Sequence, residues 1–144
     1  MKKSTTDLLK LIEKTWDFKD YEVEAAEEFV QMSLHEYLEQ LRVEKGMRLS
    51  DITRRSGLSR GYIHNIFSGA REPSRDKLLP VCLAMGLSVD ETQKLLKATG
   101  YAPLYARIKR DSAILFGLER QMSVVDVDIL LDELGEAVLN EIPR

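Results

Sequence analysis

Residues 46–69 read GMRLSDITRRSGLSRGYIHNIFSG, a pattern of two short helices joined at a central glycine. The first helix is predicted from about Leu49 to Ser56, and Gly57 ends it because glycine adopts the positive φ of a tight turn without strain. The second is predicted to begin after Ser59, which can cap it, and to end by the last glycine of the stretch. Apolar residues at helical spacing turn one face of both helices toward a shared core: Ile52, Leu58, Ile63 and Ile66. Together these signals predict a helix-turn-helix motif.

Helical signals continue on both sides of this stretch, whereas no segment alternates apolar and polar residues as a half-buried strand does. Further helices are predicted over 34–45, from Ser74 to Met85, and from Ser88 to a terminating Gly100. A serine that can cap the helix precedes each of them, and two have a capping-box glutamate three residues later, Ser33–Glu36 and Ser88–Glu91. The chain is therefore predicted to be all-α.

Pro80 is the exception within this pattern. A proline in a helix interior removes one backbone hydrogen bond and costs about 3 kcal/mol. We therefore expect either a kink at Pro80 or a helix that starts later than Ser74.

The N-terminal arm, residues 1–32, is predicted to contain a pair of short helices separated by a loop at about Asp17 to Tyr21. The apolar stripe of the first contains Leu8, Leu11 or Ile12, and Trp16, and that of the second contains Val23, Ala26, and Phe29 or Val30. These stripes are expected to serve a core or a dimer interface.

The chain resembles itself at an offset of 35 residues. Eight identities relate residues 75–100 to 110–135, among them Arg75-Asp76 with Arg110-Asp111, Ser88 with Ser123 and Gly100 with Gly135. We interpret residues 101–144 as a C-terminal extension with helices from about Arg107 to Glu119 and Val124 to Leu139. This pair would duplicate the pair in 75–100 and stack on it. Chance similarity between amphipathic helices is the alternative.

Charge is unevenly distributed along the chain. The 21 basic and 24 acidic residues give a net charge of −3, but the net charges of residues 1–40, 41–77 and 78–144 are −5, +5 and −3. A concentrated basic segment in a mildly acidic protein is typical of a surface that binds an anionic partner.

Catalytic and metal sites find no support in the sequence. The one cysteine, Cys82, lies on an apolar helix face and is interpreted as a small buried residue. His35 and His64 lack a second ligand at helical spacing and are interpreted as solvent-facing or hydrogen-bonded residues. The acidic residues of the last helix are interpreted as its solvated face: Asp126, Asp128, Asp132 and Glu133. We therefore expect no enzyme, no cofactor and no metal. A chain with no disulfide framework and no membrane span is expected in the cytoplasm.

The second helix of the central stretch is expected to expose Arg60, Gly61, Tyr62, His64 and Asn65 in its first turns. Amides at a helix N-terminus favour phosphate oxygens, and an α-helix fits the major groove of double-stranded DNA. This combination indicates a DNA-reading helix.

The chain resembles the Cro and phage-repressor type of helix-turn-helix regulators, the XRE family, over about residues 34–100. The resemblance rests on Ile52-Thr53-x-x-Ser56-Gly57-Leu58-Ser59, Tyr62-Ile63, Ile66, Ser68-Gly69 and Pro73-Ser74. It implies a five-helix DNA-binding domain, here bounded at 33–100, whose third helix reads base edges with Arg60, Gly61, Tyr62 and Asn65. It also implies phosphate contacts from Arg48, Ser59, Ser68 and Arg71.

Three positions depart from the pattern of that family. Phe67 stands where glutamate is frequent, Thr53 where alanine lets the helices approach, and Gly61 offers no side chain to a base. Base reading is therefore expected to depend mainly on Arg60 and Asn65.

The leading hypothesis is a sequence-specific DNA-binding repressor that acts as a homodimer. Dimer contacts are expected outside 46–77, on the N-terminal stripe or on a C-terminal stripe of Val127, Leu130, Leu131 and Leu134. The alternative is a protein-interaction adaptor, in which the arm or the C-terminal pair docks a partner enzyme or toxin. Steep salt dependence is expected for DNA binding and not for an apolar helix interface.

Overall fold

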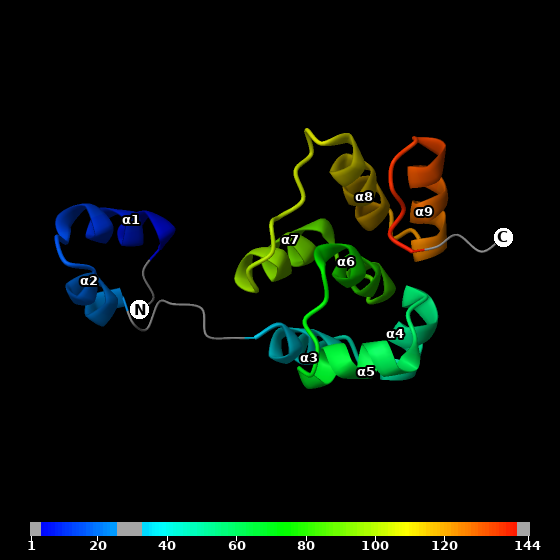
Figure 1. Cartoon of the computed structure of the whole chain (residues 1–144), viewed down its shortest axis with the longest axis horizontal. Helices are drawn as coiled ribbons and strands as arrows, with labels where there is room; N and C mark the ends of the chain where they lie inside the picture. Colours follow the sequence, from blue (N-terminus) through cyan, green and yellow to red (C-terminus); the bar gives the residue numbers. More distant parts are fainter. Residues whose placement is uncertain (1–3, 26–32, 141–144) are drawn as a thin grey trace. The chain divides into compact units, whose positions relative to one another are not determined.

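The computed structural model describes residues 4–25 and 33–140, in which all regular secondary structure is helical (Figure 1). The all-α prediction is confirmed. The chain forms two compact units, residues 1–31 and 32–144, which are described separately. No helix in the described ranges is long and apolar enough to cross a membrane.

The N-terminal unit contains helices α1 (Thr5–Lys14) and α2 (Phe18–Ala25). The loop predicted at Asp17 to Tyr21 is wrong, because α2 already begins at Phe18; the Asp17 carboxylate accepts a hydrogen bond from the Lys19 N–H, 3.0 Å away. Trp16 lies between the two helices and is fully exposed rather than part of a packed stripe. No residue of α1 is buried. The predicted stripe residues Ala26, Phe29 and Val30 lie outside the described residues.

Five helices follow in the main unit in the predicted order and within two residues of the predicted ends. They are α3 (Leu34–Glu44), α4 (Leu49–Ser56), α5 (Arg60–Ser68), α6 (Arg75–Ala84) and α7 (Val89–Ala98). The serines Ser33, Ser59, Ser74 and Ser88 each accept the backbone N–H three residues later. The full capping box predicted at Ser88 and Glu91 is present, with hydrogen bonds of 3.0 Å in both directions. Gly57, with φ 74°, makes the turn between α4 and α5.

Helix α6 runs from Arg75 through Pro80 to Ala84, so the expectation of a later start is wrong. Every residue from Leu78 to Ala84 is buried, and α6 packs against both α4 and α9. Burial of the apolar residues 78–84 at the centre of the unit outweighs the backbone hydrogen bond that proline cannot make.

Helices α8 (Lys109–Glu119) and α9 (Val124–Glu133) complete the unit. The predicted end at Leu139 is wrong: α9 ends at Glu133, because Gly135 turns the chain with φ 73°. Residues 34–139 contribute to one hydrophobic core that includes both the central helices and α8 and α9. The domain division at residue 100 therefore remains a proposal, in which the C-terminal extension is a layer on that shared core.

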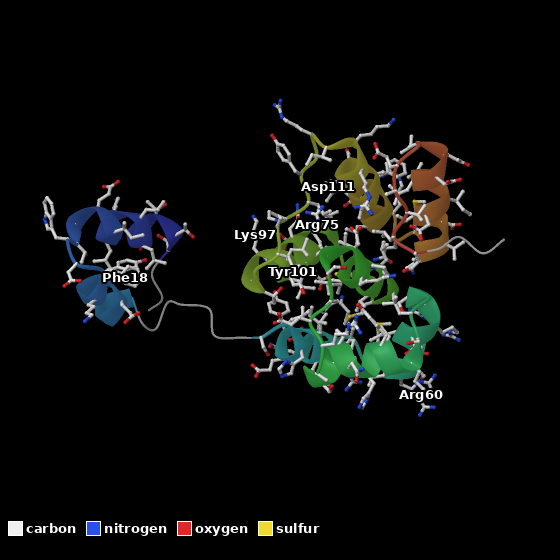
Figure 2. All side chains as sticks on the ribbon, in the orientation of Figure 1. Phe18, Arg60, Arg75, Lys97, Tyr101 and Asp111 are labelled. Atoms are coloured by element: carbon white, nitrogen blue, oxygen red, sulfur yellow. The ribbon has the colours of Figure 1, made fainter. Side chains whose placement is uncertain are left out.

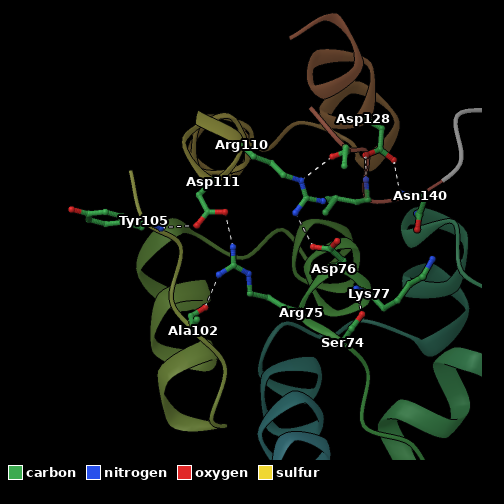
Figure 3. Close-up of polar contacts among 12 residues, drawn as sticks. Ser74, Arg75, Asp76, Lys77, Ala102, Tyr105, Arg110, Asp111, Asp128 and Asn140 are labelled. Carbon is green, nitrogen blue, oxygen red and sulfur yellow. Dashed lines mark hydrogen bonds and ion pairs between the residues drawn. The ribbon is translucent and has the colours of Figure 1, made fainter. Parts of the chain in front are cut away.

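Reciprocal contacts join the pair α6–α7 to the pair α8–α9 (Figure 3). Helix α6 packs against α9, and α8 packs against α7. The Arg75 guanidinium lies 2.5 Å from the Asp111 carboxylate, and that of Arg110 lies 2.9 Å from Asp76. These four residues are the Arg-Asp dipeptides related by the offset of 35 residues, so each helix pair supplies the same two groups to the other.

At one position of the internal repeat, a glycine in the first helix pair corresponds to a residue other than glycine in the second. Gly86 after α6 has φ 65°, and the corresponding residue after α8 is Gln121, with φ 51°. We expect Gln121→Gly to raise the free energy of unfolding by roughly 0.5–1 kcal/mol. The left-handed backbone conformation costs a residue other than glycine about 1–2 kcal/mol. Glycine also increases the entropy of the unfolded chain, and this offsets part of the gain. Urea unfolding measures this change. Gln40→Gly in the interior of α3 is the matched control and should lower the stability by about 1 kcal/mol; a Gln121→Gly protein no more stable than the parent contradicts the prediction.

Candidate nucleic-acid interface

Helix α5 presents a polar face to solvent because its apolar residues are committed to the core. Ile63, Ile66 and Phe67 are buried, and α5 packs against α3 and α4. Arg60, Gly61, His64 and Asn65 are exposed, as predicted for a reading helix. The Arg60 side chain extends away from the ribbon at the start of the helix (Figure 2).

Tyr62 behaves differently from its predicted neighbours in the site. It is half-buried and packs against the core. The Arg71 guanidinium lies over its ring, 4.8 Å from the ring centroid, and the Arg71 N–H donates to the Asn65 carbonyl at 3.1 Å. Tyr62 therefore holds Arg71 beside the end of α5, and its ring is a support for that cation.

The two predicted phosphate-contact serines are engaged in local hydrogen bonds. The Ser59 hydroxyl accepts from the Tyr62 N–H at 3.1 Å, which leaves its own proton free to donate. The Ser68 hydroxyl donates to the Asn65 carbonyl at 3.3 Å and accepts from the Ala70 N–H at 3.4 Å. Ser59 is thus the better placed of the two to donate to a phosphate oxygen.

Helix α4 adds two arginines around one carboxylate, Arg48 at its N-cap and Arg54 in its last turn. The Arg48 side chain, 80% exposed, lies 3.2 Å from Asp51, and Arg54 lies 3.3 Å from the same carboxyl. The hydrogen bond from Arg48 lowers the pKa of Asp51 below its ordinary value. Since exposed ion pairs contribute little to stability in water, phosphates can compete with Asp51 for both arginines.

A groove between α4 and α5 brings several of these residues together. Its volume is about 690 Å³, and it is lined by Leu49, Ser50, Thr53, Arg54, Arg60, Ile63 and His64. Arg60 and His64 were predicted site residues, whereas Arg54, Ser50 and Thr53 were not. The helical spacing of Arg54 from Asp51, together with the charge of the segment, is the sequence signal that could have identified it.

Cys82 and His35, which could in principle act in catalysis or bind a metal, are buried or hydrogen-bonded within the fold. Burial raises the pKa of the Cys82 thiol to about 12, in keeping with its interpretation as a buried apolar residue. The His35 ring nitrogen Nδ1 lies 3.0 Å from the Ser33 hydroxyl. Within the described ranges, no cluster of three potential metal ligands occurs.

The last helix corrects two predictions. Asp128 is not on a solvated face: it is buried, and its carboxylate accepts hydrogen bonds from the Leu139 and Asn140 N–H groups. Val127 and Leu131 are fully buried in the core, so they cannot form the proposed dimer stripe. Asp128 is covered because residues after Gly135 fold back over α9, and the two apolar residues are covered because α9 packs against α6 and α8. Helical periodicity reveals neither contact.

Comparison with known proteins identifies the central part of the chain. Residues 34–95, slightly less than half of the sequence, match a family model described as a helix-turn-helix domain. No curated protein and no solved structure matches the chain. Residues 34–95 are therefore similar to a helix-turn-helix domain, which supports DNA binding, and all the predicted contact residues lie within this range. The match is to this general class and not specifically to the Cro and phage-repressor type.

Proposed function

We propose that this protein is a sequence-specific double-stranded DNA-binding regulator of the Cro and phage-repressor type, acting as a repressor with α5 in the major groove. The observation that carries the proposal is the exposed N-terminal half of α5, where Arg60, His64 and Asn65 project from a capped helix. This helix lies in a segment of net charge +5. Because the core fixes the buried face of α5, the polar face keeps one orientation, in which it can enter the major groove.

Each group on this surface has a distinct role in the proposal. Arg60 contacts guanine and Asn65 contacts adenine, the pairings that their donors and acceptors favour in the major groove. The phosphates on either side of the helix are contacted by Arg48, Arg54, Ser59 and Arg71, and a phosphate at the end of the helix is contacted by Ser68. Gly61, without a side chain, lets the helix backbone approach the DNA closely.

A homodimer completes the proposed function. One short helix contacts few bases, so useful specificity calls for two half-sites about 10 base pairs apart. Exposed apolar side chains in the N-terminal unit support this assembly: Leu9, Ile12, Trp16 and Phe18. A palindromic sequence selected from random duplexes would report the two-fold symmetry.

A protein-interaction adaptor is the second candidate function, and one observation favours it. Helices α8 and α9 expose Phe116, Val125 and Ile129, and an apolar groove of about 290 Å³ lies beside Phe116, Leu130 and Leu134. A partner enzyme or toxin could bind there. Association through this apolar face should persist at high salt, whereas binding through phosphates should weaken steeply.

Substitutions in the reading surface test the leading proposal. Using a duplex selected by the protein from random sequences, Arg60→Ala or Asn65→Ala should cost about 1–3 kcal/mol at one base position and relax the preference there. Arg71→Ala should weaken all duplexes alike and reduce the slope of log affinity against log salt by about 1. Competition binding against single-base variants of the duplex measures both effects.

The matched control for these arginines is Arg120→Ala at the C-terminal cap of α8, where the guanidinium lies 3.5 Å from the Phe116 ring centroid. Affinity should stay within about twofold of the parent in this variant, because a surface change away from the interface costs little. A uniform loss across all bases in both the Arg60 and Asn65 variants would remove them as base readers.

A further inference from the structure

The residues that follow α9 run back to the turn of the helix-turn-helix motif. We call residues 136–140 the return segment. Two groups from α8 hold the chain here: Lys109 Nζ lies 3.3 Å from the Leu134 carbonyl just before the segment, and Arg110 Nε donates to the Ala137 carbonyl within it at 2.8 Å. The Leu139 side chain is buried in the core. The return segment is therefore anchored along its length.

The buried carboxylate of Asp128 fixes the end of this segment (Figure 3). One oxygen accepts the Leu139 N–H at 2.7 Å, and the other accepts the Asn140 N–H at 2.9 Å. Hydrogen bonds to an ionised group are stronger than neutral ones, and two from consecutive residues define the local backbone direction. This arrangement determines where the Asn140 side chain points.

The Asn140 amide contacts the helix-turn-helix motif at its turn. Its Nδ2 donates to the Ser56 carbonyl at 2.8 Å, and Ser56 is the last residue of α4. A Cβ added at Gly57, the glycine of the turn, would lie 3.1 Å from the same nitrogen. Helix α5 starts three residues after Gly57, at Arg60. The contact thus lies at the turn that joins α4 to α5, the helix proposed to read the bases.

We propose that Asn140 is a positioning residue for DNA recognition, through which the C-terminal extension sets the orientation of α5 relative to α4. The proposal rests on the proposed function. Asn140 lies outside the 34–95 match and has no need to touch DNA. Base reading requires an exact orientation of α5, whereas non-specific binding requires only positive charge near phosphates. Loss of the Asn140 contact should therefore reduce specific binding selectively.

Equilibrium binding by the full chain tests the proposal, with a selected duplex and a scrambled duplex of the same length. Asn140→Ala should weaken binding of the selected duplex about 3- to 10-fold, the range expected for one lost hydrogen bond, and leave the scrambled duplex within about twofold. Asn140→Asp should weaken the selected duplex further, because a carboxylate would face the Ser56 carbonyl. Ala137→Asp is the matched control, since it adds the same charge three residues away without facing Ser56.

Amide hydrogen exchange supplies a readout that does not depend on DNA. The Leu58 N–H donates to the Ser56 hydroxyl within the turn, at 3.2 Å. In Asn140→Ala this amide should exchange several-fold faster, while the Val127 amide in the core of α9 keeps the parent rate.

The outcomes separate this proposal from the proposed function. Unchanged affinity for the selected duplex in Asn140→Ala, or an equal loss on both duplexes, overturns the positioning role. A parent protein that binds no duplex refutes the proposed function; in that case an unchanged Leu58 exchange rate overturns the contact between Asn140 and the turn, and a faster rate supports it.

Discussion

Replacing Leu131 with alanine should lower the free energy of unfolding of the main unit by about 2–5 kcal/mol, the range for removing a buried leucine side chain. Leu131 is fully buried, and α9 packs against both α6 and α8. Because the core is continuous from Leu34 to Leu139, helices α3 to α7 should unfold in the same cooperative transition. Urea unfolding followed by circular dichroism measures this change.

Ile129→Ala provides the matched control on the same helix. Ile129 is 41% exposed, so this change should cost less than about 1 kcal/mol. If Leu131→Ala kept the parent stability and only reduced self-association, α9 would be an interface rather than a core helix.

Removing the Asp111 carboxylate is expected to have the second largest effect, a loss of about 2–4 kcal/mol with Asp111→Ala. The residue is 3% exposed, and its two carboxylate oxygens accept from Arg75 at 2.5 Å and from the Tyr105 N–H at 2.9 Å. Without the carboxylate, a largely buried guanidinium loses its counter-charge and a backbone donor loses its acceptor. The midpoint and slope of urea unfolding measure the effect.

An exposed ion pair supplies the comparison. Asp90 lies 3.0 Å from Lys94 on the surface of α7, and both side chains are at least 70% exposed. Asp90→Ala should cost less than about 1 kcal/mol. Equal losses in the Asp90 and Asp111 variants would show that the contact between the helix pairs contributes no more than a surface pair.

Local signals account for the part of the fold that the sequence predicts correctly. Ser59 and Gly57 each act within a few residues through a cap or a turn, so the bounds of α4 and α5 follow from them. Contacts between distant segments leave no such periodic mark. The start of α6 ahead of Pro80, and the burial of Asp128 by the return segment, both depend on such contacts.

In the candidate site too, local features are predicted from the sequence and contacts between distant segments are not. The exposure of Arg60 and Asn65 follows from the apolar spacing of α5 alone. Arg54 lines the groove because α4 and α5 cross, and this crossing cannot be read from the spacing of either helix. Arg71 stacks on Tyr62 because the loop after α5 turns back, which the spacing also does not predict. Asn140 could not be found from sequence spacing, since 84 residues separate it from Ser56.

The reciprocal contact between the two helix pairs also determines how such an architecture can grow. Each pair presents its first helix to the second helix of the other, which is the geometry of an isologous interface. An isologous interface uses the same surface on both sides and is complete with two members. A head-to-tail stack, in contrast, leaves one face open for every added unit and extends into a solenoid. Two such pairs in one chain therefore behave as an internal dimer, to which a third copy has no equivalent surface to add.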